Sequence, residues 1–203
     1  MTTHRYNLTT QTVLKLAANG VLRSADLAQV NIARSTLQRM RRQGLLVKLG
    51  RGLYAIANAN LSDGATLAAV ARRVPNCVVC LLSALRFHGM TTQNSAEIWI
   101  AIDQAARHPV ICGIGLRVVR CLPRLLHADV EPHVVDGVEI QVTNPARTVA
   151  DCFKHRSKVG LDVALAALQA YVRDRKGSID DLWRAAVAGR VANVLRPYLE
   201  ATT

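Results

Sequence analysis

Residues 33–56 read ARSTLQRMRRQGLLVKLGRGLYAI, and their pattern decides the fold expected for the N-terminal part of the chain. Ala33, Leu37 and Met40 recur at helical spacing, which predicts an amphipathic helix with this face turned inward. The helix would end at Gly44. The opposite face presents polar and basic side chains, with two arginines at its flanks: Arg34, Ser35, Gln38, Arg39, Arg41 and Arg42. Such donors reach phosphates and base edges, so we interpret this segment as a DNA-recognition helix.

A hairpin is predicted directly after this helix. Leu45–Leu49 and Leu53–Ile56 are strand-like, and Gly50-Arg51-Gly52 between them supplies the flexible backbone of a tight turn. Lys48 adds a cation to the first strand, and Arg51 adds one at the tip of the turn. We interpret this basic hairpin as the wing of a winged helix-turn-helix.

Two further helices are expected upstream. Thr10 can cap a first helix with apolar side chains at helical spacing, and Asn19-Gly20 would end it. Ser24 can cap a short second helix that carries Asp26 in its first turn. Three short helices followed by a basic hairpin indicate a winged helix-turn-helix DNA-binding domain over residues 1–60.

Two groups of side chains would contact double-stranded DNA in different ways. The residues expected to enter the major groove and read base edges are Arg34, Ser35, Gln38 and Arg39. The residues expected to neutralise phosphates are Arg41, Arg42, Lys48 and Arg51.

The charge distribution supports this interpretation. The 203 residues include 26 Lys and Arg against 14 Asp and Glu, which gives a formal net charge of +12. Nine of these cations, opposed by one acidic residue, fall within residues 1–56, where they mark an electrostatic footprint for nucleic acid. An apolar share of 50% is enough for a folded core and excludes a basic disordered tail.

Neither a membrane span nor a secretory signal is expected. No stretch approaches the roughly 20 uninterrupted apolar residues that span a bilayer, so we expect a cytoplasmic protein. Five cysteines, mostly among apolar neighbours, favour reduced buried thiols over disulfides: Cys77, Cys80, Cys112, Cys121 and Cys152. Cys77 and Cys80 have the spacing of half a zinc site, but no second ligand pair follows, so we expect neither a metal nor a cofactor.

A second, mixed α+β domain is predicted to follow a polar linker over Ala57–Gly64. The strand-like segments are Glu97–Asp103, Leu116–Cys121 and Val138–Val142, and Leu81–His88 is helical. Further helices are expected to begin at Asn144-Pro145, near Leu161, at Ser178 and near Val191. This domain would span residues 61–203 and end in a run of helices, which makes the whole chain α+β.

Four short segments occur in an order that resembles AbiEi-type antitoxins. They are Gly50–Tyr54 at the wing, Ser83–Thr91 (SALRFHGMT), Ile98–Ala101 (IWIA) and Asn144–Asp151 (NPARTVAD), with Met90 where leucine is expected. The resemblance covers nearly the whole chain. It implies a DNA-binding partner of a nucleotidyltransferase-like toxin in an abortive-infection, or type IV, toxin-antitoxin system for phage defence.

The same resemblance implies a separate function for each of the two domains. The N-terminal winged helix would act as a transcriptional repressor of its own promoter. The C-terminal domain would neutralise the toxin, with or without direct contact. The alternative that the residues leave open is a plain transcriptional regulator whose C-terminal domain senses a ligand or mediates oligomerisation.

Enzymes that act on nucleic acids do not fit the residue pattern. A restriction-type nuclease needs an acidic residue followed by a Glu-x-Lys pair to hold Mg²⁺, and no glutamate here has lysine two positions later. A nucleotidyltransferase needs a Gly-Ser turn well upstream of an Asp-x-Asp pair, whereas Gly177-Ser178 runs into the adjacent Asp180-Asp181. We therefore expect a non-enzymatic protein.

Other polar residues of the second domain have ordinary explanations. His88 has no nucleophile or acidic group at a telling spacing, so we expect it in the core or at a helix end. Arg147 and Asp151 are expected to pair across one helical turn. A basic cluster is interpreted as a solvated face, with a partner surface as the alternative: Arg147, Lys154, Arg156 and Lys158.

Overall fold

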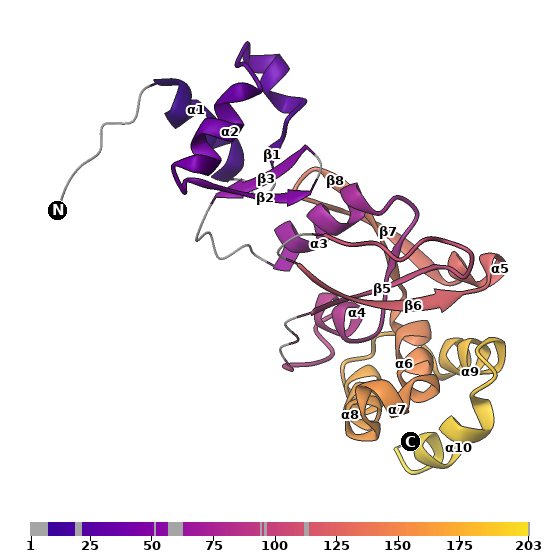
Figure 1. The fold of residues 1–203 in the computed structure, drawn as a ribbon. Coiled ribbons are helices and arrows are strands. Elements are labelled where there is room, and N and C mark those ends of the chain that lie inside the picture. Colours follow the sequence, from indigo (N-terminus) through magenta and orange to yellow (C-terminus); the bar gives the residue numbers. More distant parts are fainter. Residues whose placement is uncertain are drawn as a thin grey trace. The chain divides into compact units, whose positions relative to one another are not determined.

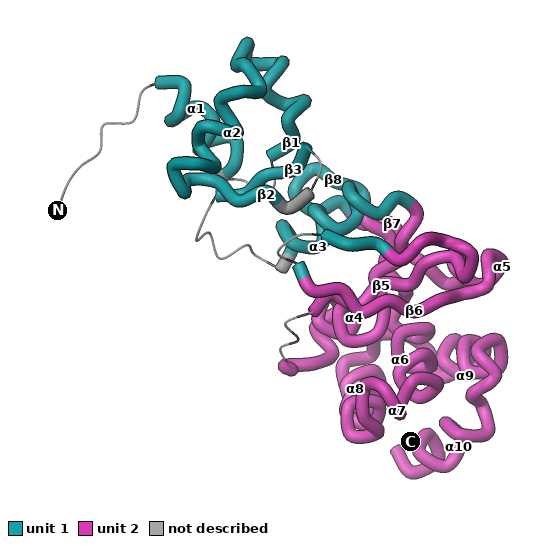
Figure 2. Tube along the Cα trace, in the orientation of Figure 1, with its two compact units in different colours: residues 1–75, 109–114, 134–139 teal, residues 76–108, 115–133, 140–203 magenta. Residues whose placement is uncertain are grey.

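The computed structural model describes residues 8–18, 22–50, 52–56, 63–93, 95, 97–111 and 114–202. They belong to two compact units (Figure 2). Unit 1 comprises residues 1–75, 109–114 and 134–139, and unit 2 comprises residues 76–108, 115–133 and 140–203. Helices and strands both contribute, and the predicted α+β class is confirmed.

The N-terminal part of unit 1 is a winged helix-turn-helix. Its elements are α1 (Leu8–Ala18), β1 (Leu22–Arg23), the 3-10 helix η1 (Asp26–Val30), α2 (Ser35–Arg42), β2 (Leu46–Gly50) and β3 (Leu53–Ile56) (Figure 1). The strands form an antiparallel sheet in the order β1-β3-β2. The recognition helix and the hairpin therefore follow one another as predicted.

A small apolar core holds this domain together. Every helix and strand of the domain contributes to it, through Val13, Ala17, Leu22, Leu27, Leu37, Met40, Leu46 and Tyr54. Because burial of one leucine or methionine side chain contributes about 1.5–3 kcal/mol, this shared core is what fixes the short helices on the sheet.

Some details predicted for the helices are wrong. Helix α1 begins at Leu8, so Thr10 lies inside it and does not cap it. The short helix after Ser24 is a 3-10 helix without a side-chain cap. Ala33 was predicted to lie on the buried face of the recognition helix, but it is exposed. Helix α2 begins only at Ser35, so Ala33 does not follow the helical spacing of Leu37 and Met40.

Unit 1 extends beyond the winged helix. It includes α3 (Asp63–Arg73), the segment 109–114 with an isolated antiparallel bridge between Ile111 and Ile114, and residues 134–139. The predicted helix stop at Asn19-Gly20 and residues 57–62 of the linker lie outside the described residues. The domain boundary near residue 60 therefore stays a prediction.

A five-stranded mixed sheet, in the order β6-β5-β4-β8-β7, forms the second part of the fold. Its strands are β4 (Val78–Val79), β5 (Glu97–Asp103), β6 (Gly115–Cys121), β7 (Val130–Val135) and β8 (Val138–Thr143). Strand β4 pairs antiparallel with β5 and parallel with β8, and β5 pairs parallel with β6. The three predicted strands are confirmed, whereas β4 and β7 were not predicted.

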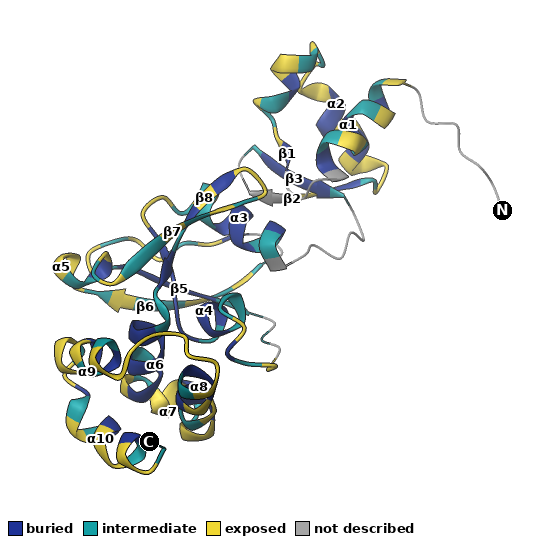
Figure 3. Cartoon of the chain, turned by 180° about the vertical axis from the view of Figure 1, so that it is seen from behind, coloured by how far each residue is buried: buried dark blue, intermediate teal, exposed yellow. Residues whose placement is uncertain are grey.

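Helices complete unit 2. They are α4 (Leu81–Phe87), α5 (Pro123–Leu126), α6 (Pro145–Lys154), α7 (Arg156–Val159), α8 (Leu161–Arg173), α9 (Ile179–Ala188) and α10 (Ala192–Glu200). Helix α6 is central, because it contacts α4, α8, α9 and α10. Helices α8, α9 and α10 each have buried and exposed faces (Figure 3). Asn144 caps α6, and Ser178 forms a capping box with Asp181 at α9, as the sequence predicts.

The Asn144–Asp151 segment braces the start of α6. The carboxamide oxygen of Asn144 accepts a hydrogen bond from the backbone N–H of Arg147, with 2.8 Å between the oxygen and the nitrogen. The Nε of Arg147 donates to Asp151 at 3.3 Å, and its Nη1 donates to the backbone carbonyls of Leu126 and Ala128. Arg147 is only 9% exposed. The solvated-face interpretation is therefore wrong for Arg147, although Lys154, Arg156 and Lys158 are exposed.

The cysteines follow the expectation of buried thiols. Cys77, Cys80 and Cys152 are buried and free. Burial raises the pKa of the Cys77 thiol to about 12 and also raises the pKa of the Cys80 and Cys152 thiols well above the ordinary value. These thiols are therefore protonated and unreactive at neutral pH. Cys121 is half-buried and free, and Cys112 lies outside the described residues.

His88 lies at the end of α4, where its Nε2 is 2.7 Å from the carbonyl oxygen of Thr143. Within the described ranges, no group of three His, Cys, Asp or Glu side chains is placed to hold a metal ion. Every helix in those ranges is too short or too polar to span a lipid bilayer.

We predict that Arg147→Ala lowers the free energy of unfolding by about 3 kcal/mol, because Asp151 and two carbonyls lose their buried donor. Urea denaturation monitored by circular dichroism measures the change. The control Lys158→Ala removes an exposed cation of α7 and should stay within about 0.5 kcal/mol of wild type. Equal losses of unfolding free energy in the two variants would show that the hydrogen bonds of Arg147 to Asp151, Leu126 and Ala128 contribute nothing to stability.

Candidate nucleic-acid interface

Six of the eight residues predicted to contact DNA lie on α2 or directly before it. Arg34 precedes the helix, and Ser35 is its first residue. The exposed side chains are Arg34, Ser35, Gln38, Arg39, Arg41 and Arg42. Thr36, Leu37 and Met40 are buried on the other face. The structure thus brings together the predicted donors of this helix on one surface.

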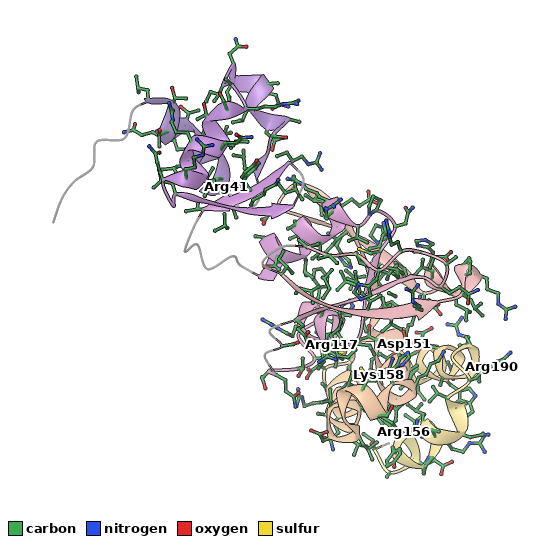
Figure 4. All side chains as sticks on the ribbon, viewed as in Figure 1. Arg41, Arg117, Asp151, Arg156, Lys158 and Arg190 are labelled. Atoms are coloured by element: carbon green, nitrogen blue, oxygen red, sulfur yellow. The ribbon has the colours of Figure 1, made fainter. Side chains whose placement is uncertain are left out.

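The helical period explains this separation. Ser35, Gln38, Arg39 and Arg42 stand at i, i+3, i+4 and i+7, which aligns them in one stripe. Arg41 flanks the stripe and is labelled in Figure 4. No ion pair or side-chain hydrogen bond within the described part of the chain occupies the arginines of α2. Their guanidinium groups therefore remain available to an external anion.

The turn before α2 sets the direction of the helix. Asn31 adopts a left-handed conformation with φ of 52°, which lets the chain reverse between η1 and α2. The backbone N–H of Ile32 donates to the carbonyl of Leu27 at 3.0 Å. Because Leu27 and Leu37 both lie in the core, the two helices are fixed on either side of this turn.

The position of the α2 arginines matches the helix dipole. Arg39, Arg41 and Arg42 lie in the last turn, where positive charge interacts favourably with the negative end of the dipole. The acidic residue of this region, Asp26, accepts the backbone N–H of Arg23 at 2.8 Å and lies in η1 rather than beside the arginines. The outer face of α2 therefore carries positive and neutral polar side chains and no acidic one.

The wing is a short hairpin held close to the turn that precedes η1. Lys48 is exposed on β2 and pairs in register with Tyr54 on β3. Arg51, predicted at the tip, lies outside the described residues. The backbone N–H of Ser24 donates to the carbonyl of Gly52 at 2.7 Å. This bond joins the helix-turn-helix to the wing.

Gly52 is required at this junction for two reasons. Its φ is +74°, a conformation that L-residues rarely adopt, and a Cβ at this position would lie 2.9 Å from the Ser24 hydroxyl. The sequence predicted that Gly52 belongs to a flexible turn. It did not predict the contact of Ser24 with Gly52, because the two residues are far apart in the sequence. Ser24 and Gly52 therefore position the wing. Among the described residues of the wing, Lys48 supplies the positive charge.

The order α1, η1 and α2 followed by the β2-β3 hairpin is the arrangement of winged helix-turn-helix domains. Residues 11–57 match the family model described as "Transcriptional regulator, AbiEi antitoxin". The predicted resemblance to AbiEi-type antitoxins is thereby confirmed over this segment, which runs from α1 through the wing. The three other segments that carried the resemblance lie outside the match, so its extent over the rest of the chain stays a prediction.

One solved structure shares the fold over nearly the whole chain. The fold is similar to the crystal structure of the RV2827C protein from Mycobacterium tuberculosis, with a TM-score of 0.62 and 17% sequence identity. The match covers 98% of this chain and 83% of that one. At this identity the likeness concerns the fold alone. Comparison with curated proteins gave no match.

We expect the affinity for promoter DNA to fall steeply with salt, because cations of α2 and the wing displace counterions from phosphates. Arg42→Ala and Lys48→Ala should each reduce the slope of log K against log salt concentration by about one unit. Fluorescence anisotropy over a salt series measures the slopes. The control Arg173→Ala removes an exposed arginine of α8 and should leave the slope unchanged. An unchanged slope in Arg42→Ala and Lys48→Ala would remove both residues from the interface.

Gly52→Ala should weaken both stability and promoter binding, because it strains the backbone and displaces Ser24. We expect a loss of about 1–3 kcal/mol in the free energy of unfolding. Gly44→Ala is the matched control, since Gly44 has a similar φ of +71° but no neighbour within 4 Å of the added Cβ. Its loss of stability should be smaller. Equal unfolding energies for the two variants would refute a role for the Ser24 contact.

Proposed function

We propose that this chain is the antitoxin of a toxin-antitoxin system and represses its own promoter through the N-terminal winged helix. The observation that carries the proposal is the outward basic face of α2, whose arginines have no ion-pair partner among the described residues, within the segment that matches the AbiEi family model. Such a face is suited to a major groove, and the wing is suited to the adjacent phosphate backbone.

The second half of the proposal concerns the partner. The C-terminal domain neutralises a nucleotidyltransferase-like toxin encoded in the same operon, in the cytoplasm and without enzymatic activity of its own. The family match of the N-terminal segment supports this role, because the family description names an antitoxin. The protein then serves phage defence by releasing and restraining the toxin.

Repression and protection should be separable in the full-length chain. Full-length protein is the correct material, because unit 1 includes residues 109–114 and 134–139, and a cut near residue 60 would divide it. The triple variant Arg34→Ala, Arg39→Ala and Arg42→Ala should relieve repression of a promoter reporter at least tenfold. The same variant should still protect cells when the toxin is expressed from an unrelated promoter.

The control for this test is a triple alanine variant that removes the same charge elsewhere, at Arg107, Arg173 and Arg175, which are exposed. It should repress and protect like wild type. Failure of the wild-type chain to protect would overturn the antitoxin role. Loss of protection together with repression in the α2 variant would favour a plain transcriptional regulator.

A further inference from the structure

Gln38 lies near the middle of the exposed face of α2. Side chains two positions apart on an α-helix point about 160° away from one another. Thr36 and Met40, two positions before and after Gln38, are 8% and 0% exposed. The burial of both residues therefore directs the side chain of Gln38 away from the core, and Gln38 is exposed.

Cations surround this glutamine along the helix. Arg34 and Arg42 stand four positions before and after it, and Arg41 stands three positions after it, so all three are its neighbours on the helix surface. Arg34 is the N-cap of α2, but its φ of −58° and ψ of −26° are helical, so the spacing holds there as well. Gln38 is thus a neutral side chain at the centre of a basic face.

The carboxamide of Gln38 is available to an external partner. Within the described part of the chain, its side chain makes no hydrogen bond. Its Oε1 accepts and its Nε2 donates, side by side. Phosphate binding is driven mainly by cations that release counterions, and an uncharged carboxamide releases none. Its central position among arginines therefore favours a contact with base edges over a contact with the DNA backbone.

We infer that Gln38 recognises an adenine in the major groove and is a specificity-determining residue of this interface. The inference rests on the proposed function, in which α2 enters the major groove of the promoter. Adenine presents its N7 acceptor beside its N6 donor there, so Nε2 of Gln38 donates to N7 and Oε1 accepts from N6. Guanine presents two acceptors, cytosine a donor, and thymine an acceptor beside a methyl group, so none of them offers the same pair.

The neighbours of Gln38 are less selective. The hydroxyl of Ser35, three positions earlier, can donate and accept, so it pairs with more than one base. Arg34 and Arg42 can pair with guanine, but their guanidinium groups also bind phosphates. Among the exposed residues of α2, Gln38 is therefore the one that we expect to require an A·T base pair.

The test uses the full-length chain and a library of DNA duplexes with a random central segment. Sequencing the duplexes that wild type retains gives its preferred site. The same selection with Gln38→Ala should lose the requirement for adenine at one position for each bound copy of the chain. Alanine is the strongest helix former, so this variant keeps α2. The matched control Gln43→Ala removes an exposed glutamine at the C-cap of the same helix and should select the wild-type site.

Fluorescence anisotropy then measures affinity for the selected duplex and for duplexes in which that A·T pair is replaced. Wild type should bind the replaced duplexes about tenfold more weakly, whereas Gln38→Ala should bind all of them with equal affinity. A duplex with 7-deazaadenine at this position keeps its base pair but lacks the N7 acceptor. It should weaken wild-type binding about threefold, the effect of one lost hydrogen bond, and leave Gln38→Ala unaffected.

Other outcomes overturn the inference. An equal loss of affinity in Gln38→Ala on every duplex would make Gln38 a backbone contact, and selection of an unchanged site would refute any base contact. A preference lost at a G·C pair would rule out adenine. The same loss in Gln43→Ala would show a general effect on the helix. An equal effect of 7-deazaadenine on wild type and Gln38→Ala would show that another residue reads N7.

Failure of the proposed function gives a different result. Wild-type protein that selects no site and does not bind its own promoter would overturn repression through the winged helix. Wild-type protein that binds its promoter but shows any of the outcomes above would overturn the role of Gln38 alone.

Discussion

The burial of Leu37 and Met40 is the constraint on which the candidate nucleic-acid interface depends. These side chains are 1% and 0% exposed and share a core with α1, η1 and the sheet. Once they are buried, the rotation of α2 about its axis is fixed, and Arg39 and Arg42 must face outward. Two apolar residues on the buried face of α2 thus determine which cations its exposed face presents to a DNA groove.

Arginine has a different part in unit 2. Arg147 is buried, and its charge is satisfied by Asp151 and by the carbonyls of Leu126 and Ala128, which ties the loop after α5 to α6. Its planar guanidinium group donates in several fixed directions, so one side chain can bind a carboxylate and two backbone carbonyls at once. The exposed arginines of α2 have no such partners within the described residues. The surroundings, rather than the residue type, separate the buried structural arginine of α6 from the exposed arginines of α2.

Local patterns predicted much of the fold, and long-range contacts account for the rest. The helical spacing of apolar residues predicted α2, and the caps at Asn144-Pro145 and Ser178 predicted the starts of α6 and α9. These patterns could be recognised because each is formed by residues close together in the sequence. Strand β4 has only two residues, and β7 contains Pro132, so neither shows a period that a sequence reading detects. Arg147 was assigned to the surface because its carbonyl acceptors lie 19 and 21 residues away. The bond between Ser24 and Gly52 was missed for the same reason.

The clustering of charge on α2 is itself an argument about function. Arg39, Arg41 and Arg42 repel one another, and residues three apart on a helix face destabilise it when they carry like charges. Placement in the last turn offsets part of this cost through the helix dipole, and burial of Leu37 and Met40 offsets more. A helix selected for stability alone would intersperse acidic residues, as α9 does with Asp181 beside Arg184. The absence of acidic residues from α2 costs stability in the free protein and gains affinity only when a polyanion is bound.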